Sequence, residues 1–437
     1  MNNKFIELRA RHERLIYRNF KVSEGKIIFH FSIDEYHFKP EWEFNVPLHG
    51  NIDLLAFNLG MAELISYWKC ACPPVVEVRC GQLSDWQIEW WKKLYRNGLG
   101  EFFYTNNIKP DDDFMQIHAM GEKLPPPQKR ELAGCLIPVG GGKDSIVTLE
   151  LLREQKDVSG AALNTCYVAG NIQSALDCAK AAGYADSQII QVNRTIDPAL
   201  LELNKRGYLN GHTPFSSIVA FSSLIFAYLA GKKYIVLSNE SSANEGNVAG
   251  DSGVNHQYSK SAEFERDFRE YTAQISADLP EYFSLLRPLT EARITEIFFH
   301  YPKYYNVFKS CNVGSKTNTW CCKCAKCLYV YVMLSAWMDD EVLVNIFSEN
   351  LYEDIELAPL LEALANPDFD KPFECVGTRK EVNFSLHRAF HRRQNPPKLL
   401  RDYADKIHKP DTKEIKDILN YFDENHFVPE EFLRLLK

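Results

Sequence analysis

The part of this chain best suited to chemistry is an apolar run that ends in three consecutive glycines. Residues 135–139 are mostly apolar, residues 140–142 are all glycine, and apolar residues recur with helical spacing over 146–152. This order predicts a strand, a tight loop and the N-terminus of a helix. Glycines let backbone N–H groups approach an anion closely, and the helix dipole adds partial positive charge there. The residues expected to contact such an anion are Gly140, Gly141, Gly142, Lys143, Asp144 and Ser145.

The order Gly-Gly-x-Asp-Ser at 141–145 resembles the pyrophosphate loop of the PP-loop ATPases, usually written Ser-Gly-Gly-x-Asp-Ser. It differs from the Walker loop, which requires Gly-x-x-x-x-Gly-Lys followed by Ser or Thr. Gly140 stands where the family has its first Ser, so one hydroxyl contact to phosphate is missing. The resemblance implies that ATP is bound with Mg²⁺ and cleaved to AMP and pyrophosphate, commonly while a carboxylate is adenylated. The alternative is a glycine-rich turn without a ligand.

The composition of the whole chain limits the classes of protein to be considered. Its 437 residues, 45% hydrophobic and 25% charged, are typical of a globular protein of two or three domains. The net charge of -8 argues against a nucleic-acid partner and is compatible with a small-molecule substrate. We find neither a run of about 18 apolar residues nor a signal-peptide core. We therefore expect a cytoplasmic protein with no membrane association.

Composition and periodicity divide the chain into four segments. We expect an α+β domain at 1–105, a polar linker at 106–130, an ATP-binding domain at 131–340 and a mainly helical region at 341–437. Alternating strands and helices in the third segment indicate the α/β class, with a doubly wound parallel sheet. Its predicted strands are 132–139, 160–164, 188–192 and 234–238, and its predicted helices are 145–153, 172–182 and 215–229. In the first segment we expect a hairpin of strands 26–33 and 36–44, a helix at 54–68, a strand at 75–78 and a helix at 85–94.

Polar residues follow three of the predicted strands of the third segment. Because ligands bind outside the carboxyl ends of parallel strands, these residues should meet at one nucleotide site. Asn164 and Thr165 are expected near the base or the ribose, and Glu240 beside the phosphates.

The substrate is expected to be bound by polar segments near the same strand ends. Thr213 is the expected N-cap of the helix at 215–229 and Pro214 its first residue, while the preceding His212 is a candidate substrate contact. Residues 239–261 form a long polar loop, and loops of this length inside a domain are often functional. A polar break at 370–381 interrupts the helical region. The candidate substrate contacts are His212, Ser216, Glu245, Asn247, Tyr258 and Arg379.

A cluster of cysteines follows the predicted ATP-binding strands. Cys321-x-x-Cys324-x-x-Cys327, with Cys311 ten residues upstream, supplies four thiolates, which are enough to close a tetrahedral zinc site. Four protein ligands leave no open position, so the zinc would be structural, and Cys322 would point away from it. The alternative is a redox or sulfur-transfer set. The layout resembles the zinc site of 7-cyano-7-deazaguanine synthase, which also follows a PP-loop domain.

Several motifs occur together in residues 135–381 and resemble one family. They are G-G-G-K-D-S, S-N-E-S-S-A-N-E-G-N-V, V-N-H-Q-Y-S-K-S, W-C-x-K-C-x-K-C and K-P-F-E-C-V-G-T. The family is that of the ATP-dependent UDP-N-acetylmuramoyl-L-alanyl-L-glutamate epimerases of bacterial peptidoglycan synthesis. The resemblance implies inversion of the terminal L-Glu of UDP-MurNAc-L-Ala-L-Glu to D-Glu, with release of AMP and pyrophosphate.

The residues present are compatible with that chemistry. A proton next to an ionised carboxylate is hard to remove, whereas adenylation removes the charge and lets a side-chain base take the α-proton. His256, Lys260 and Cys375 have the side chains required of the base, and the sequence does not rank them. The second hypothesis is a PP-loop ligase that forms an amide or a nitrile. A third is a nucleotide-binding scaffold without catalysis, in which Gly140 marks a decayed loop.

Overall fold

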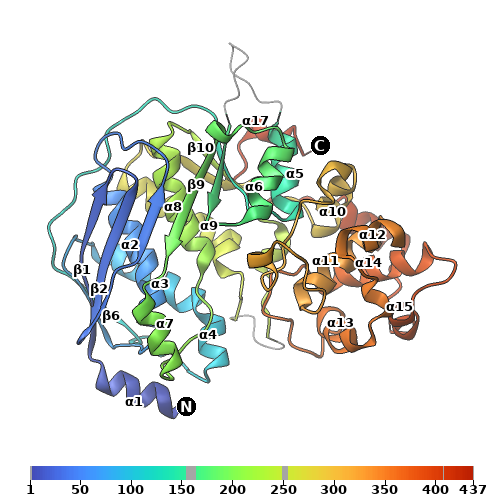
Figure 1. The fold of residues 1–437 in the computed structure, drawn as a ribbon, viewed down its shortest axis with the longest axis horizontal. Coiled ribbons are helices and arrows are strands. Elements are labelled where there is room, and N and C mark those ends of the chain that lie inside the picture. The colour runs from blue at the N-terminus through green and yellow to red at the C-terminus, as the bar shows by residue number, and fades with distance from the viewer. Residues whose placement is uncertain (1, 154–163, 249–253, 407, 437) are drawn as a thin grey trace.

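The computed structural model describes residues 2–153, 164–248, 254–406 and 408–436. A single large sheet runs through it, with the strand order β11-β10-β7-β8-β9-β4-β2-β1-β5-β6 and with β3 paired to β2 (Figure 1). Helices cover this sheet, and the C-terminal helices gather beyond its parallel end, on the right of Figure 1.

The parallel part of the sheet contains the glycine loop. Its strands are β7 (Cys135–Pro138), β8 (Thr165–Ala169), β9 (Ile189–Thr195), β10 (Tyr234–Leu237) and β11 (Glu281–Ser284), and their pairings with one another are all parallel. The chain passes from β7 to β8 and β9 on one side, and then crosses to β10 on the other side of β7. The order therefore reverses at the carboxyl end of β7, where ligands bind in open α/β sheets. The predicted α/β class and parallel sheet are confirmed.

Helices cover both faces of these strands, and successive strand residues alternate between two cores. Leu136 packs in the core that holds α8 (Phe215–Leu229), whereas its neighbours Cys135 and Ile137 pack in the core on the other face. Helix α8 is apolar on nearly all sides and is almost completely buried, as expected for a helix inside the molecule. The first core also holds α2 (Asp53–Trp68), α3 (Asp85–Gly98) and α9 (Ala262–Ile275), and the second holds α5 (Lys143–Leu152), α6 (Gln173–Ala181) and α10 (Glu291–Phe299).

The N-terminal strands continue the same sheet. Strand β4 (Glu41–Phe44) pairs with β9 in antiparallel register, so residues 1–105 do not build a sheet of their own. Strand β6 lies inside the segment predicted to be a linker and forms the far edge. The other elements of this part are α1 (Asn3–Arg11), β1 (Arg14–Ser23), β2 (Lys26–Ile33), β3 (Tyr36–Phe38), β5 (Val75–Val78), α4 (Gly100–Thr105) and β6 (Gln116–Ala119).

The C-terminal region is helical, as predicted. Helix α11 (Ala325–Ser335) is buried on nearly every side, and α13 and α14 pack against it. The core that these helices share with α5, α6 and α10 attaches them to the parallel part of the sheet. The remaining helices are α12 (Asp340–Phe347), α13 (Ala358–Ala365), α14 (Arg379–His391), α15 (Lys398–Tyr403), α16 (Thr412–Leu419) and α17 (Glu430–Leu433).

Three local predictions differ from the structure. Residues 160–163 of the strand predicted at 160–164 lie outside the described residues, and β8 begins only at Thr165. Pro214, not Thr213, occupies the N-cap position of α8, because the Thr213 hydroxyl is bonded to Lys69 instead. The strand predicted at 36–44 is interrupted: Pro40 has no N–H to donate, and β3 and β4 form on either side of it.

Among the described residues, no helix is both long and apolar enough to cross a membrane. The remaining α-helix is α7 (Pro198–Lys205), and Asp197 is its N-cap.

A buried ion pair joins helix α2 to strand β9 and provides a test of the fold. Arg194 on β9 donates to both carboxylate oxygens of Glu63 on α2, at 2.7–3.1 Å, and Glu63 is fully buried. We expect Glu63→Gln to lower the free energy of unfolding by about 3–5 kcal/mol, because it leaves a buried guanidinium without its counter-charge. Urea denaturation measures this change. Glu41→Gln, which removes a more exposed partner of Lys26, should change stability by less than about 1 kcal/mol. Equal effects of the two variants would contradict this account.

Candidate active site

The glycine loop leaves β7 and enters α5 at the switch point of the sheet. Gly141 has a φ of +83°, and a Cβ there would lie 2.5 Å from Ser174 Oγ, so only glycine fits. Its carbonyl accepts a hydrogen bond from the Lys309 backbone at 2.8 Å, which fixes the loop. Gly142 is the N-cap of α5 and has no side chain to cap it. The N–H groups of the first turn are therefore available to an anion.

A pocket of about 310 Å³ opens in front of this loop. Its wall combines the loop, the ends of neighbouring strands and two segments that come from much later in the chain. Gly140, Gly142, Asp144 and Ser145 line one side. The other lining residues with reactive or charged side chains are Glu240, Lys260, Lys309, Cys311, Lys326, Glu374 and Cys375.

Three carboxylates meet beside the loop. One oxygen each from Asp144, Glu240 and Glu291 lie within 4.8 Å of one another, and the two glutamates are buried. The ammonium of Lys143 is bonded to both Asp144 and Glu291. Burial by itself would raise the pKa of Asp144, but Lys143 lowers it below its ordinary value. Burial and the charge of Asp144 raise the pKa of Glu291 to about 8.

This donor set is suited to a divalent cation. Mg²⁺ prefers carboxylate oxygens, and a second positive charge would relieve the repulsion that a single lysine leaves. Asp144 and Glu240 also line the pocket, so a cation bound by them would face whatever occupies it. Lys143 is 3% exposed and does not line the pocket; its ammonium holds the carboxylates instead of reaching a phosphate.

The second group of the site centres on Cys375, in the segment between α13 and α14. Its Sγ lies 3.0 Å from Lys260 Nζ, and His256 is a second basic neighbour of the same thiol. Burial alone would raise the pKa of Cys375, but Lys260 and His256 lower it well below the usual value of a thiol. The Lys260 ammonium therefore favours the thiolate form of Cys375. The structure brings together His256, Lys260 and Cys375, the three predicted candidates for the base.

A glutamate from the N-terminal part completes this group. Glu101 on α4 is hydrogen-bonded to His256 Nδ1, and His212 Nδ1 lies 3.3 Å from the same carboxylate oxygen. Burial lowers the pKa of His256, but Cys375 and Glu101 outweigh it and raise that pKa to about 9. Burial and the neighbouring His256 lower the pKa of His212 to about 3, so His212 is neutral.

Arg287 joins the backbone at Glu240 to the backbone at Lys260. It is fully buried, and its guanidinium donates to the backbone carbonyls of Glu240 and Lys260 and to the Glu265 carboxylate at 3.1 Å. The carbonyl at Glu240 is 2.6 Å away. Arg287 therefore sets the distance between the carboxylate cluster and the Lys260–Cys375 pair.

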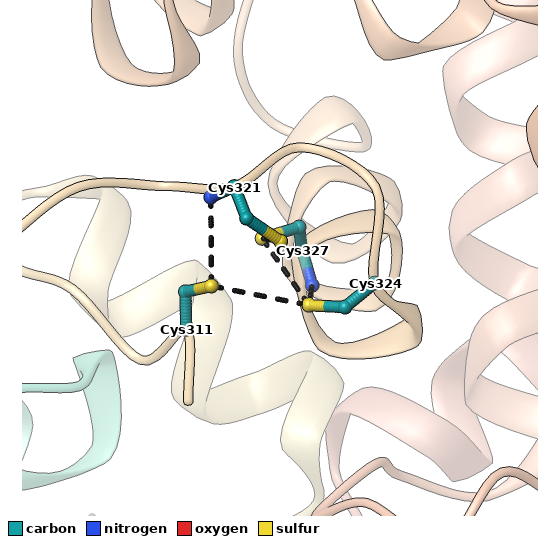
Figure 2. A group of neighbouring side chains, drawn as sticks. All are labelled: Cys311, Cys321, Cys324 and Cys327. Atoms are coloured by element: carbon teal, nitrogen blue, oxygen red, sulfur yellow. Dashed lines mark hydrogen bonds between the residues drawn. The ribbon is translucent and has the colours of Figure 1, made fainter. Parts of the chain in front are cut away.

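The four predicted cysteine ligands are gathered in one place (Figure 2). The Sγ atoms of Cys311, Cys321, Cys324 and Cys327 all lie within 4.8 Å of one another. Cys324 also caps α11, accepting the N–H of Cys327 at 3.4 Å, and Cys311 accepts that of Gly314 at 3.2 Å. Such donors stabilise thiolates, which are the form that binds zinc. Cys322 turns away and donates its thiol to the Phe347 carbonyl at 3.2 Å.

Asn164 and Thr165, two of the predicted nucleotide contacts, lie at the amino ends of the parallel strands, opposite the glycine loop. Because β8 begins at Thr165, Asn164 and Thr165 stand at its amino end, whereas the glycine loop leaves the carboxyl end of β7. The side chain of Asn164 accepts from the Cys135 backbone at 3.2 Å and donates to the Leu152 carbonyl at 2.9 Å. These bonds are structural, so neither residue belongs to the candidate site.

The predicted substrate contacts divide into two groups. Ser216 lines the pocket, and His212 belongs to the Glu101–His256 group. The other four do not line it. Glu245 is paired with Lys371, and Tyr258 is buried against α9. Asn247 bonds the backbones of His256 and Pro372, and the Arg379 guanidinium bonds the carbonyls of Asn366 and Phe369.

Sequence reasoning missed four residues of the site. Glu101, Arg287, Glu291 and Lys309 lie in segments without a recognisable motif. The only local feature near any of them is Thr290, which caps α10 in front of Glu291 and by itself marks no more than a helix start. Their roles arise from contacts between separate elements, across 155 residues between Glu101 and His256 and across 47 between Arg287 and Glu240.

Comparison with known proteins connects this geometry to one family. The model of the MurL N-terminal domain matches residues 8–285, and that of the MurL C-terminal domain matches residues 307–417. A protein of Xanthomonas oryzae pv. oryzae (strain MAFF 311018) is 34% identical over 330 residues, which are 74% of this chain and 71% of that protein. A protein of Salinispora tropica is 31% identical over 386 residues, covering 84% and 82%. Both are named UDP-N-acetyl-alpha-D-muramoyl-L-alanyl-L-glutamate epimerase.

No solved structure matches the chain. The family expected from the motifs is confirmed by two domain models that together span both halves of the sequence. The chain belongs to the MurL family.

Proposed function

We propose that this protein is an isomerase that epimerises the terminal glutamate of UDP-N-acetyl-α-D-muramoyl-L-alanyl-L-glutamate. The names of its relatives support this substrate and this reaction. The observation that carries the proposal is one pocket lined both by the anion-binding loop and by the Lys260–Cys375 pair. Activation of a carboxylate and removal of the adjacent proton can therefore occur at one place.

Activation is assigned to the loop side of the pocket. ATP supplies the adenylyl group, and the glutamate α-carboxylate attacks the α-phosphorus, so that pyrophosphate leaves. The free N–H groups at the start of α5 and the Lys309 ammonium are placed to hold phosphate oxygens. Asp144, Glu240 and Glu291 would hold Mg²⁺, which offsets phosphate charge during the transfer.

Inversion is assigned to the opposite side. Adenylation removes the charge of the carboxylate, so the α-proton becomes acidic enough for a side-chain base. His256, Lys260 and Cys375 are neighbouring side chains that can take that proton and return one. Hydrolysis then releases the D-glutamyl product and AMP, and peptidoglycan precursor synthesis is the process served.

The cysteine cluster is assigned to structural zinc. Four sulfur ligands close a tetrahedral site and leave no position for substrate. The cluster also borders the pocket through Cys311, so the metal would stabilise one wall of it.

The first prediction concerns activation. Asp144→Asn should reduce the formation of AMP and pyrophosphate by at least about 100-fold, because it removes a charged group beside the phosphates. A pyrophosphate-release assay with ATP, Mg²⁺ and the L-Glu substrate measures this. The control is Asp85→Asn, which changes another carboxylate in the first turn of a helix, outside the pocket, and should keep the native rate. Native turnover of Asp144→Asn would refute the assignment of the loop.

The second prediction concerns the metal. Cys324→Ser should lower zinc content and melting temperature together, because binding free energy on the order of 10 kcal/mol is also folding free energy. Metal analysis and thermal unfolding provide the two measurements. Cys322→Ser should change neither, since that thiol faces Phe347. Iron and inorganic sulfide in the purified protein would overturn the zinc assignment.

The third prediction separates activation from inversion. Lys260→Ala should continue to release pyrophosphate from the L-Glu substrate but lose deuterium uptake from D₂O at Cα, by at least about 100-fold. Proton NMR of the product and a pyrophosphate assay give the two rates. Lys398→Ala, an exposed lysine paired with Asp402 on α15, serves as the control. If Lys260→Ala, His256→Ala and Cys375→Ala all exchange deuterium at the native rate, the base lies elsewhere.

A further inference from the structure

Cys375 has the surroundings of a nucleophile as well as those of a base. His256 is hydrogen-bonded to the Glu101 carboxylate and lowers the pKa of the Cys375 thiol, and a basic imidazole near sulfur activates a cysteine in nucleophilic catalysis. Lys260 adds an ammonium 3.0 Å from the same sulfur. The sulfur lines the pocket that also contains Asp144 and the glycine loop.

The other cysteines outside the four-cysteine cluster show how unusual this environment is. Burial raises the pKa of Cys70, Cys80 and Cys135 to about 12, so these thiols are unreactive. Among the described cysteines outside the cluster, Cys375 is the one that has a cationic partner and also lines the pocket in front of the glycine loop. Its backbone is also held, because Lys326 donates to its carbonyl.

We propose that Cys375 takes the activated glutamyl group from AMP as a thioester, and that the configuration at Cα is inverted in this covalent form. The proposal rests on the proposed function, which supplies the acyl-adenylate. The thiolate attacks the carbonyl carbon, a C–S bond forms, and the C–O bond to AMP breaks with its electron pair on the phosphate oxygen. The Lys260 ammonium, 3.0 Å from the sulfur, stabilises the thiolate, so the attack can begin from ionised sulfur with no proton to remove.

A thioester suits the next step. Sulfur donates its lone pair to a carbonyl less effectively than oxygen does, so the α-proton of a thioester is more acidic than that of a carboxylate or an ester. Acylation also removes the thiolate charge beside Lys260. Burial lowers the pKa of Lys260, and the negative charge of Cys375 is the largest of the effects that raise it. Once Cys375 is acylated, Lys260 therefore releases its proton to solvent more readily and becomes an amine. The amine takes the α-proton, and the C–H electron pair moves into the enolate of the thioester. A solvent proton is then added to the opposite face of Cα, and Lys260 passes the removed proton to solvent and is again an amine.

Water ends the sequence. Its oxygen adds to the carbonyl carbon, and the C–S bond breaks with its electron pair on sulfur, which regenerates the thiolate. One proton of the water returns to Lys260 as ammonium and the other leaves with solvent, because the product is an ionised carboxylate. Glu101 is a positioning residue in this scheme: it orients His256 and touches no reacting atom.

The test is detection of the acyl-enzyme. The native protein is mixed with ATP, Mg²⁺ and UDP-MurNAc-L-Ala-L-Glu, quenched in acid within one turnover and examined by mass spectrometry. We expect an adduct of the substrate mass minus water on the peptide that contains Cys375. It should require ATP and should be released by neutral hydroxylamine, as thioesters are.

Lys260→Arg makes the adduct accumulate. Arginine keeps the positive charge that stabilises the thiolate but is not deprotonated in proteins, so acylation continues and proton transfer stops. We expect deuterium uptake to fall at least about 100-fold, while most of the enzyme carries the adduct. Cys375→Ala should form no adduct and should still release pyrophosphate. Cys80→Ala, which removes a thiol outside the pocket, should behave as the native protein.

The outcomes distinguish a failure of the thioester proposal from a failure of the proposed function. If the native protein forms AMP and D-Glu, but neither it nor Lys260→Arg ever carries an adduct, the thioester is excluded and the proposed function stands. If an adduct forms on a residue other than Cys375, the proposal is also wrong. If no AMP forms from this substrate, the proposed function itself fails, and the thioester fails with it.

Discussion

Mutual repulsion among three carboxylates is the constraint around which the site is built. Asp144, Glu240 and Glu291 are held within 4.8 Å of one another in a largely buried place, which is unfavourable without compensating positive charge. Lys143 supplies part of that charge from inside the loop. Glu381 fixes the backbone of Glu291, whose N–H donates to it at 2.6 Å. The protein therefore holds the three carboxyl groups where a metal cation bound between them would also face the pocket.

Close packing around the three carboxylates requires a glycine at position 377, which is far from them in the sequence. A Cβ at Gly377 would lie 2.6 Å from Tyr329 Oη and 3.2 Å from Glu291 Cγ, so a larger residue would displace the carboxylate. Gly377 is two residues after Cys375, and the segment that contains both is also held from the cysteine cluster. Asn312, next to Cys311, donates to Glu374 at 2.9 Å. A change in the cysteine cluster would thus be transmitted to the segment that carries Cys375.

The continuous sheet gives the N-terminal part a direct role in the site. Strand β4 pairs with β9, and the ion pair between Glu63 and Arg194 reinforces the junction. Helix α4 is held by buried Phe102 and Phe103, and the Glu101 beside them reaches His256 from the other part of the chain. The imidazole of His256 is therefore oriented by a residue 155 positions earlier in the sequence. Separating the two parts would leave that imidazole without its carboxylate.

The local sequence determined the glycine loop, the parallel strands after it, the four cysteines of the cluster and the three candidate bases, because each depends on residue types at short spacing. Tertiary structure decided the rest. Asn164 was misplaced because periodicity does not locate the first residue of a strand, and here its side chain bonds the backbones of Cys135 and Leu152. Glu101, Arg287 and Glu291 are ordinary charged residues in sequence, and they acquire functions only through contacts between distant elements. A charge becomes functional when folding removes it from water and gives it a partner, and spacing along the chain carries no information about that partner.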